Sequence, residues 1–222
     1  YDLENDTYNL YCSSQGVHSL KKKLSNIFNI QEKKLNVFTP DVGGGFGSKI
    51  YHYGEEALVL AASNKLCRPV KWTATRSESF LTDAHGRDHV TKMELACEKD
   101  GTFIAFRMDT MANVGAYLSN FSTATPTFLH GTLMAGNYTV PHVYVNVKTV
   151  FTNTAPVDAY RGAGRPEATF SIERVIDKCA HELGLDAMEV RRKNFIKPNQ
   201  FPYVSAAGLE YDTGNYLSLI HI

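Results

Sequence analysis

The sequence has few cysteines, and none of them are close together. Its 222 residues include four, Cys12, Cys67, Cys97 and Cys179, with no C-x-x-C pair. This spacing argues against a zinc or iron–sulfur site within the chain, and equally against a disulfide framework. Isolated cysteines are typical of proteins from a reducing compartment, so we expect a cytoplasmic protein.

Long apolar runs and an excess of charge are also missing. No apolar stretch approaches the ~18 residues of a membrane span, and the N-terminus lacks the architecture of a signal peptide. Basic and acidic residues number 23 each, so the sequence lacks the electrostatic footprint of a nucleic-acid binder. The one basic cluster, Lys21–Lys23, lies in an amphipathic pattern and predicts a solvated helix face. We therefore expect no membrane span and no nucleic-acid partner.

The two ends of the sequence lack the usual features of chain termini. It begins "YDLENDTYNL" without an initiator methionine, and it ends "NYLSLIHI" without a helix cap or a polar tail. We expect an internal segment of a longer polypeptide, with some functional residues outside it.

Apolar periodicity predicts alternating strands and helices in the first third of the chain. Strands are expected at 8–13 and 33–39, helices at 16–30 and 52–64, and a further short strand at 69–74. A glycine-rich loop separates the second strand from the second helix. This order is typical of α/β alternation.

The rest of the chain predicts more strands and two helices. Residues 88–117 favour two strands joined at the Asp100-Gly101 turn, and 142–151 alternates as a strand. A long irregular excursion, 116–137, lies between them. Pro166 begins a helix that ends near Gly184, and Asp186 caps a short one after it. The apolar positions expected on one face of the longer helix are Phe170, Ile172, Val175, Ile176, Cys179 and Leu183. Overall we predict an α+β (mixed α/β) fold with mixed sheets and flanking helices.

Two glycine-rich loops hold the strongest functional signal. The first, "GGGFGSK" at 43–49, allows close approach of the backbone to a ligand, and its N–H groups can converge on an anion. It fails the Walker pattern because Ser48 precedes Lys49, and it fails the dinucleotide pattern because Ser48 stands where the third glycine belongs. The second, "AYRGAGRPEA" at 159–168, fails the dinucleotide pattern too. For a single such loop, a simple tight turn is an equally good interpretation.

Four motifs taken together are more specific than either loop. "QGVH", "DVGGGFGSK", "ANVGAY" and "AYRGAGRPEA" occur in this order and spacing. In this they resemble the molybdenum-binding large subunit of the xanthine dehydrogenase/aldehyde oxidase family, including its bacterial carbon-monoxide-dehydrogenase-like branch. The resemblance reaches "GLEYDTGNY" at 208–216. It implies that residues 1–222 belong to one molybdopterin-binding domain, with cofactor loops at 41–50 and 157–166 and the C-terminal half of the subunit absent.

The resemblance implies a cofactor and the residues around it. The cofactor is molybdenum on molybdopterin, in a bacterial relative as the cytosine dinucleotide, with no protein side chain as a direct metal ligand. Gln15 resembles the glutamine that donates to the molybdenum oxo group, and Arg161 resembles the arginine facing the centre. The implied cofactor-binding residues are Gln15, Gly44, Gly45, Phe46, Gly47, Tyr160, Arg161 and Gly162. Three of these residues have an alternative interpretation. Gln15 could be a surface amide before a helix, Phe46 a core anchor, and Arg161 a surface arginine that pairs with Glu167.

The implied reaction is hydroxylation of an aldehyde or N-heteroaromatic carbon by water, with hydride passing to molybdenum. The resemblance places the glutamate base downstream of this chain. Glu55 and Glu56 are expected to be ordinary helix residues.

Three positions bear on the substrate. Purine-oxidising relatives carry a glutamate, an arginine and an aromatic residue where this sequence has Ile50, Leu129 and Ala163. This argues against xanthine, because a site without matched polar partners binds a purine poorly. Copper-containing CO dehydrogenases carry a cysteine where Gly162 stands, which argues against a copper–molybdenum centre.

The resemblance also implies partners. A [2Fe–2S] subunit and an FAD subunit would complete the enzyme, as a dimer of heterotrimers. Two other hypotheses remain open at this point. The chain could be a catalytically degenerate assembly module, or a phosphate- or nucleotide-binding α/β domain that uses "GGGFGSK".

Overall fold

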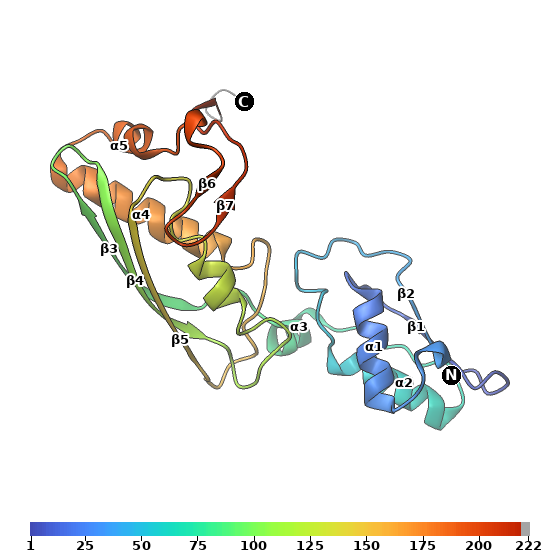
Figure 1. Ribbon diagram of the computed structural model, residues 1–222. Coiled ribbons are helices and arrows are strands. Elements are labelled where there is room, and N and C mark those ends of the chain that lie inside the picture. Colours follow the sequence, from blue (N-terminus) through green and yellow to red (C-terminus); the bar gives the residue numbers. More distant parts are fainter. Residues whose placement is uncertain (219–222) are drawn as a thin grey trace. The chain divides into compact units, whose positions relative to one another are not determined.

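The computed structural model describes residues 1–218, so 219–222 of the predicted domain lie outside the described residues. The chain divides into two compact units (Figure 1). The first comprises residues 1–85 together with 159–161, and the second comprises residues 86–158 and the chain from Gly162 onward. Helices and mixed sheets give the predicted α+β class. Within the described residues, no helix is long and apolar enough to cross a membrane.

The first unit is built on a pair of parallel strands. β1 (Tyr8–Tyr11) pairs with β2 (Leu35–Phe38), and α1 (Val17–Phe28) and the short η1 (Glu32–Lys34) make the crossover that parallel pairing requires. After the glycine loop comes α2 (Gly54–Leu66). The core of the unit is formed by Tyr8, Leu10, Leu20, Leu24, Leu35 and Leu60. The strands and helices predicted as far as residue 66 are confirmed.

The strand predicted at 69–74 is wrong. These residues form no regular element, and α3 (Arg76–Thr82) follows instead. Local β propensity is insufficient here because, in the described part of the chain, no strand pairs with this segment. The helix starts at a capping box, in which Thr75 Oγ1 accepts from Glu78 N and the Glu78 carboxylate accepts from Thr75 N. This T-x-x-E signal was present in the sequence.

The second unit holds a three-stranded sheet of order β3-β4-β5. β3 (His89–Cys97) and β4 (Phe103–Asn113) form the predicted hairpin, and β5 (His142–Val150) lies parallel to β4. α4 (Arg165–Leu183) lies across one face of this sheet (Figure 1). The remaining elements are η2 (Thr125–Leu129), α5 (Ala187–Asn194), η3 (Pro198–Gln200), β6 (Tyr203–Val204) and β7 (Glu210–Tyr211).

The buried stripe of α4 differs from the predicted one. Ala168, Ile172, Ile176 and Ala180 recur every four residues and are buried against the sheet, while Phe170 is 68% exposed. The prediction was wrong about Phe170 because it weighted large apolar residues and overlooked the two alanines. Small residues in the stripe allow the helix to approach the sheet closely.

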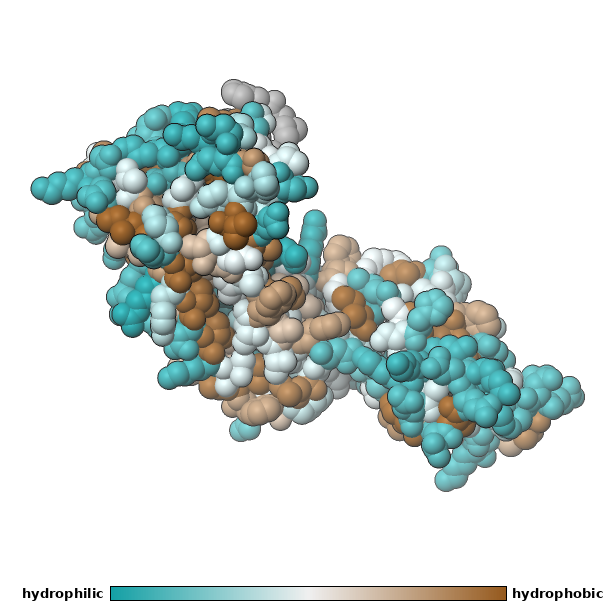
Figure 2. Space-filling view, viewed as in Figure 1, coloured by the Kyte–Doolittle hydropathy of each residue, from teal (hydrophilic) through white to brown (hydrophobic). Residues whose placement is uncertain are grey.

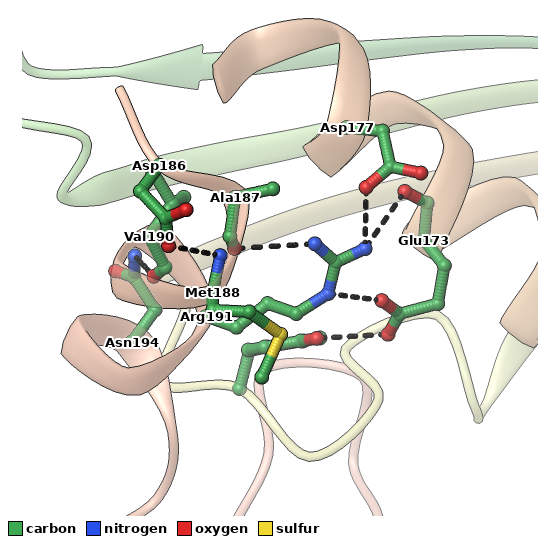
Figure 3. A network of polar contacts seen from close by, with 9 residues as sticks. Glu173, Asp177, Asp186, Ala187, Met188, Val190, Arg191 and Asn194 are labelled. Atoms are coloured by element: carbon green, nitrogen blue, oxygen red, sulfur yellow. Dashed lines mark hydrogen bonds and ion pairs between the residues drawn. The ribbon is translucent and has the colours of Figure 1, made fainter. Parts of the chain in front are cut away.

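An arginine joins α5 to α4. Arg191 Nε donates to the Glu173 carboxylate at 2.7 Å, and its Nη2 donates to Asp177 at 2.8 Å (Figure 3). The arginine is held from its own helix too, because Nη1 donates to the carbonyl of Ala187. Tyr138 donates its hydroxyl to the second oxygen of Glu173. This network fixes the two helices of the second unit against one another.

Hydrophobic side chains also reach the surface. On the face drawn in Figure 2, they gather in a band over the unit that carries the sheet, between hydrophilic margins. Exposed apolar residues of this unit include Val90, Met111, Tyr144, Phe151 and Phe170.

Candidate functional site

The glycine loop between β2 and α2 depends on backbone conformations that favour glycine. Gly43, Gly44 and Gly47 have φ of 65°, 92° and 95°, and Phe46 has φ of 53°. Three left-handed glycines explain most of the glycine count. Phe46 is 53% exposed, so it is not a core anchor. A bulky residue in a sparsely populated backbone conformation, with its ring outside the core, is more typical of a ligand-binding loop than of a turn that only reverses the chain.

Gln15 is held by this loop. Its Oε1 accepts from the backbone N–H of Gly47 at 3.0 Å and of Lys49 at 3.3 Å, while its own N–H donates to the Lys49 carbonyl at 2.8 Å. A Cβ at Gly45 would lie 2.2 Å from Gln15 Cδ, so Gly45 is required for this contact. Because the loop occupies Oε1, the amide Nε2 is fixed as the outward donor. Gln15 is thus exposed just before α1, as its alternative interpretation had it, but its side-chain oxygen is anchored in the loop.

The lysine that ends the loop is part of its scaffold. Lys49 Nζ donates to Ser13 Oγ at 3.2 Å and to the carbonyl of Val42. Tyr53 donates to the Ser48 carbonyl at 2.7 Å and braces the far side of the turn. The ammonium that a phosphate-binding interpretation would use is thus bonded within the loop.

The start of the second loop packs on the first. Arg161 N donates to the Phe46 carbonyl at 2.8 Å, and the Arg161 guanidinium lies 5.9 Å from the centre of the Phe46 ring. Tyr51 donates its hydroxyl to the Ala159 carbonyl. A Cβ at Gly47 would lie 2.9 Å from that same carbonyl, so the loops could not meet this closely with a side chain there.

Together these residues form one exposed surface on the first unit, named here the Gln15–Phe46–Arg161 face. It presents an amide donor, an aromatic ring and a guanidinium, and Tyr160 is exposed beside them. In the described part of the chain, no three His, Cys, Asp or Glu side chains are placed to hold a metal ion. Such a face can bind a ligand rich in hydrogen-bond acceptors and anionic oxygen.

The rest of the second loop belongs to the second unit. Gly162 has φ of 102°, and a Cβ there would lie 2.6 Å from Pro166. Gly164 lies against the end of η2, where a Cβ would meet the Thr125 carbonyl at 2.7 Å and His130 N at 2.8 Å. Of the predicted substrate-pocket residues, Leu129 ends η2 and Ala163 precedes Gly164, so these two share this junction. Ile50 lies in the first unit, where its N–H donates to the Gly47 carbonyl.

A buried polar group that was not predicted from sequence lies beside this junction. His130 is fully buried, with Nε2 3.0 Å from Met108 Sδ, and its Nδ1 has no hydrogen-bond partner among residues 1–218. Burial, and then the nearby His89, lower its pKa to about 4. Burial lowers the pKa of His89 too. An isolated histidine in a Ser/Thr-rich stretch gives no periodic signal, so His130 could not be placed in the interior from sequence.

Known proteins resemble this chain over most of its length. Residues 1–195 match the family model described as the molybdopterin cofactor-binding domain. The chain belongs to that family.

Individual members of the family align with nearly the whole chain. The carbon monoxide dehydrogenase large chain of Hydrogenophaga pseudoflava is 39% identical over 211 residues, which cover 93% of this chain and 26% of that protein. The nicotine 6-hydroxylase large subunit of Paenarthrobacter nicotinovorans is 30% identical, covering 99% and 27%. Quinoline 2-oxidoreductase from Pseudomonas putida 86 superimposes with a TM-score of 0.91 at 34% identity, covering 96% and 27%. The chain thus spans about a quarter of the length of its relatives.

The residues of the Gln15–Phe46–Arg161 face fit the cofactor of this family. A molybdopterin centre needs donors for its oxo and phosphate oxygens, and space for a close backbone approach. The outward Nε2 of Gln15 and the guanidinium of Arg161 are such donors. The left-handed glycines leave the loop without side chains at Gly43 and Gly44, both of which are exposed.

Proposed function

We propose that this chain forms part of the cofactor envelope in the catalytic subunit of a molybdenum hydroxylase. The single observation that carries the proposal is the convergence of Gln15, the glycine loop and Arg161 on one face, through hydrogen bonds between segments far apart in the sequence. The family match extends over residues 1–195, and we include both units, through residue 218, in the domain.

Each residue of the face has a distinct role in the proposal. Gln15 Nε2 would donate to an oxo oxygen of the bound metal centre, because the loop already occupies Oε1. Gly44 and Gly45 would let the backbone approach the cofactor, and the exposed Phe46 ring would contact it. The Tyr160–Gly162 segment brings the Arg161 guanidinium to the same place. When bound, the cofactor supplies two-electron chemistry that oxidises the substrate carbon with oxygen derived from water.

The general base of this reaction is not assigned to the described residues. Glu56 accepts from the Tyr53 N–H at 3.2 Å and contacts His52 Nδ1 at 2.8 Å, so it caps α2, and Glu55 lies in the same first turn. Both are the ordinary helix residues that the sequence predicted. We propose that the base comes from the remainder of the subunit.

We propose an N-heteroaromatic compound or an aldehyde as the substrate, with Ile50, Leu129 and Ala163 contributing to its pocket. Their apolar side chains favour an aromatic ring without dense polar edges over a purine. CO is disfavoured despite the 39% identity to a CO dehydrogenase chain. A cysteine at Gly162 would need its Cβ where Pro166 already lies, 2.6 Å away. The relatives named for quinoline and nicotine support the heteroaromatic class.

The cofactor form and the partner subunits complete the proposal. We propose the cytosine dinucleotide form of molybdopterin, a [2Fe–2S] subunit and an FAD subunit, assembled as a dimer of heterotrimers in the cytoplasm. The names of the relatives support a multi-subunit enzyme. They include a large chain, a large subunit and the gamma subunit of a 6-hydroxypseudooxynicotine dehydrogenase complex.

Isotope incorporation tests the reaction class. The intact protein, matured with its partners in a molybdenum-competent host, is incubated in ¹⁸O-water with an artificial electron acceptor. Quinoline, nicotine and benzaldehyde are supplied in turn, with xanthine and CO as comparison substrates. We expect ¹⁸O in the product of at least one of the first three. Turnover of only xanthine or CO, or product oxygen that derives from O₂, would contradict the proposal.

A further inference from the structure

The fold brings together two cysteines that are 82 positions apart in the sequence. Cys97 ends β3 and Cys179 lies in the last part of α4, and their Sγ atoms are 3.2 Å apart. Both are free thiols. This pair could not be predicted from sequence, because it depends on the packing of α4 on β3 within the second unit.

The surroundings of the pair leave it accessible. Both cysteines are partly exposed, at the margin of the core and not inside it. Val175 lies four residues before Cys179, on the same side of α4. It lines an open groove of about 820 Å³ between β3 and α4. Met93 of β3 and Lys178 of α4 also line this groove. A small solute can therefore come close to the two sulfur atoms without unfolding of the unit.

The other two cysteines differ in having no neighbouring thiol. Cys12 and Cys67 lie in the first unit and both are free. Burial, with a contribution from Glu56, raises the pKa of Cys12 to about 11. Cys67 is exposed, and its Sγ donates to the Asn64 carbonyl at 3.5 Å. The chain therefore contains its own controls, one shielded thiol and one exposed thiol.

We propose that Cys97 and Cys179 form a reversible disulfide that a peroxide produces and a dithiol reduces. In the first step, one sulfur attacks a peroxide oxygen, the O–O bond breaks, and sulfenic acid and water form. In the second, the other sulfur attacks the sulfenic sulfur and a second water leaves. Two thiols thus lose two electrons and two protons, and hydrogen peroxide is reduced to two waters.

Burial and the short Sγ–Sγ contact affect the reactivity of the pair. Burial, and next the hydrogen bond with Cys97, raise the pKa of Cys179 to about 12, so this thiol is protonated at neutral pH. Thiolate is the reactive form toward peroxide. Proton loss from Cys179 is therefore disfavoured, and at an Sγ–Sγ distance of 3.2 Å either sulfur can resolve a sulfenic acid formed on the other.

The disulfide would link the C-terminal part of α4 to the end of β3 and close a loop between residues 82 positions apart. Cross-links that close long loops stabilise mainly by restricting the unfolded chain. We expect oxidation to raise the melting temperature of the second unit by roughly 10 °C.

Peptide mapping of the intact protein tests the proposal. The reduced protein is exposed to graded hydrogen peroxide, alkylated, digested and analysed by mass spectrometry, and a matched sample is then reduced with dithiothreitol. We expect a Cys97–Cys179 cross-linked peptide in most molecules, its loss with dithiothreitol, and the rise in melting temperature. In Cys179→Ser, dimedone should label Cys97, because the sulfur that would resolve its sulfenic acid is missing.

The wild-type measurement alone can overturn the proposal, so it does not depend on how the variants fold. Cys97 and Cys179 recovered as separate alkylated thiols, at peroxide concentrations that oxidise Cys67, would reject it. So would conversion of either to sulfinic acid without cross-linking, or cross-links only between separate chains.

Discussion

Gln15 has the most defined geometry of the proposed site residues. Two loop N–H groups fix its Oε1, so truncation removes both the amide donor and the anchor of the loop. We expect Gln15→Ala to lower turnover of the intact enzyme by roughly 10- to 100-fold, the range for groups that support a metal centre from outside its ligand shell. The matched control is Gln31→Ala, which removes an exposed glutamine elsewhere in the first unit. Equal activity of the two variants would remove Gln15 from the site.

Gly45 offers a second test at the same position in space. A methyl at Gly45 would overlap Gln15 Cδ, whereas a methyl at Gly54 would meet nothing within 4 Å, and neither glycine has a positive φ. We expect Gly45→Ala to reproduce the activity loss of Gln15→Ala, with Gly54→Ala close to wild type. Steady-state kinetics and thermal melting of both variants check this. A large fall in melting temperature for Gly45→Ala alone would indicate a structural role instead.

The burial of His130 leads us to predict that the free energy of unfolding falls in acid. Its pKa is lowered to about 4 in the folded protein because it is buried. The unfolded chain therefore binds the proton more strongly, and the stability this histidine contributes above about pH 6.5 is lost as pH falls toward 4. Over this pH range, the free energy of unfolding falls by about 3 kcal/mol because of this histidine. Urea unfolding between pH 7 and pH 4 should show a shallower decline for His130→Leu than for wild type, while His142→Leu, at an exposed site, follows wild type. Parallel declines for all three would rule out His130 as the cause.

Among the elements, α4 and α5 depend on one polar network. Arg191 is 15% exposed, whereas its partners Glu173 and Asp177 are more open to solvent, which weakens the pair. We expect Arg191→Met to cost about 1–2 kcal/mol in the free energy of unfolding. The control is Arg192→Met at the next position, which removes an exposed ion pair with Glu189. It should lower the free energy of unfolding by less than about 0.5 kcal/mol. Chemical denaturation measures both, and equal losses would contradict the account.

The same elements indicate how much of the fold the sequence could predict. Strands and helices with a clear period, such as β3, β5 and α1, were predicted because burial of one face leaves a local pattern. The strand at 69–74 was wrong because a strand needs a neighbour, and propensity does not supply one. Phe170 was placed in the core because periodicity alone cannot weigh Ala168 and Ala180 against a larger side chain.

The site was predictable for a different reason. Gln15, the glycine loop and Arg161 were selected by resemblance, and their hydrogen bonds to one another became visible only in the structure. Glycine count suggested a ligand, but periodicity gave no indication that Gly45 accommodates Gln15 or that Lys49 is bonded within the loop. The Cys97–Cys179 pair and buried His130 left no local pattern, because each is produced by packing between distant segments.

As a whole, the chain belongs to the molybdopterin cofactor-binding family, and we propose that its first unit presents a face to the metal centre. Electron paramagnetic resonance of one-electron-reduced molybdenum tests that proposal most directly, in the intact enzyme with wild-type sequence, Gln15→Ala or Gln31→Ala. The account predicts a molybdenum signal in all three, with g-values shifted only in Gln15→Ala, because that amide donates to an oxo oxygen of the centre. Absence of molybdenum from wild-type enzyme, or identical g-values in wild type and Gln15→Ala, would contradict it.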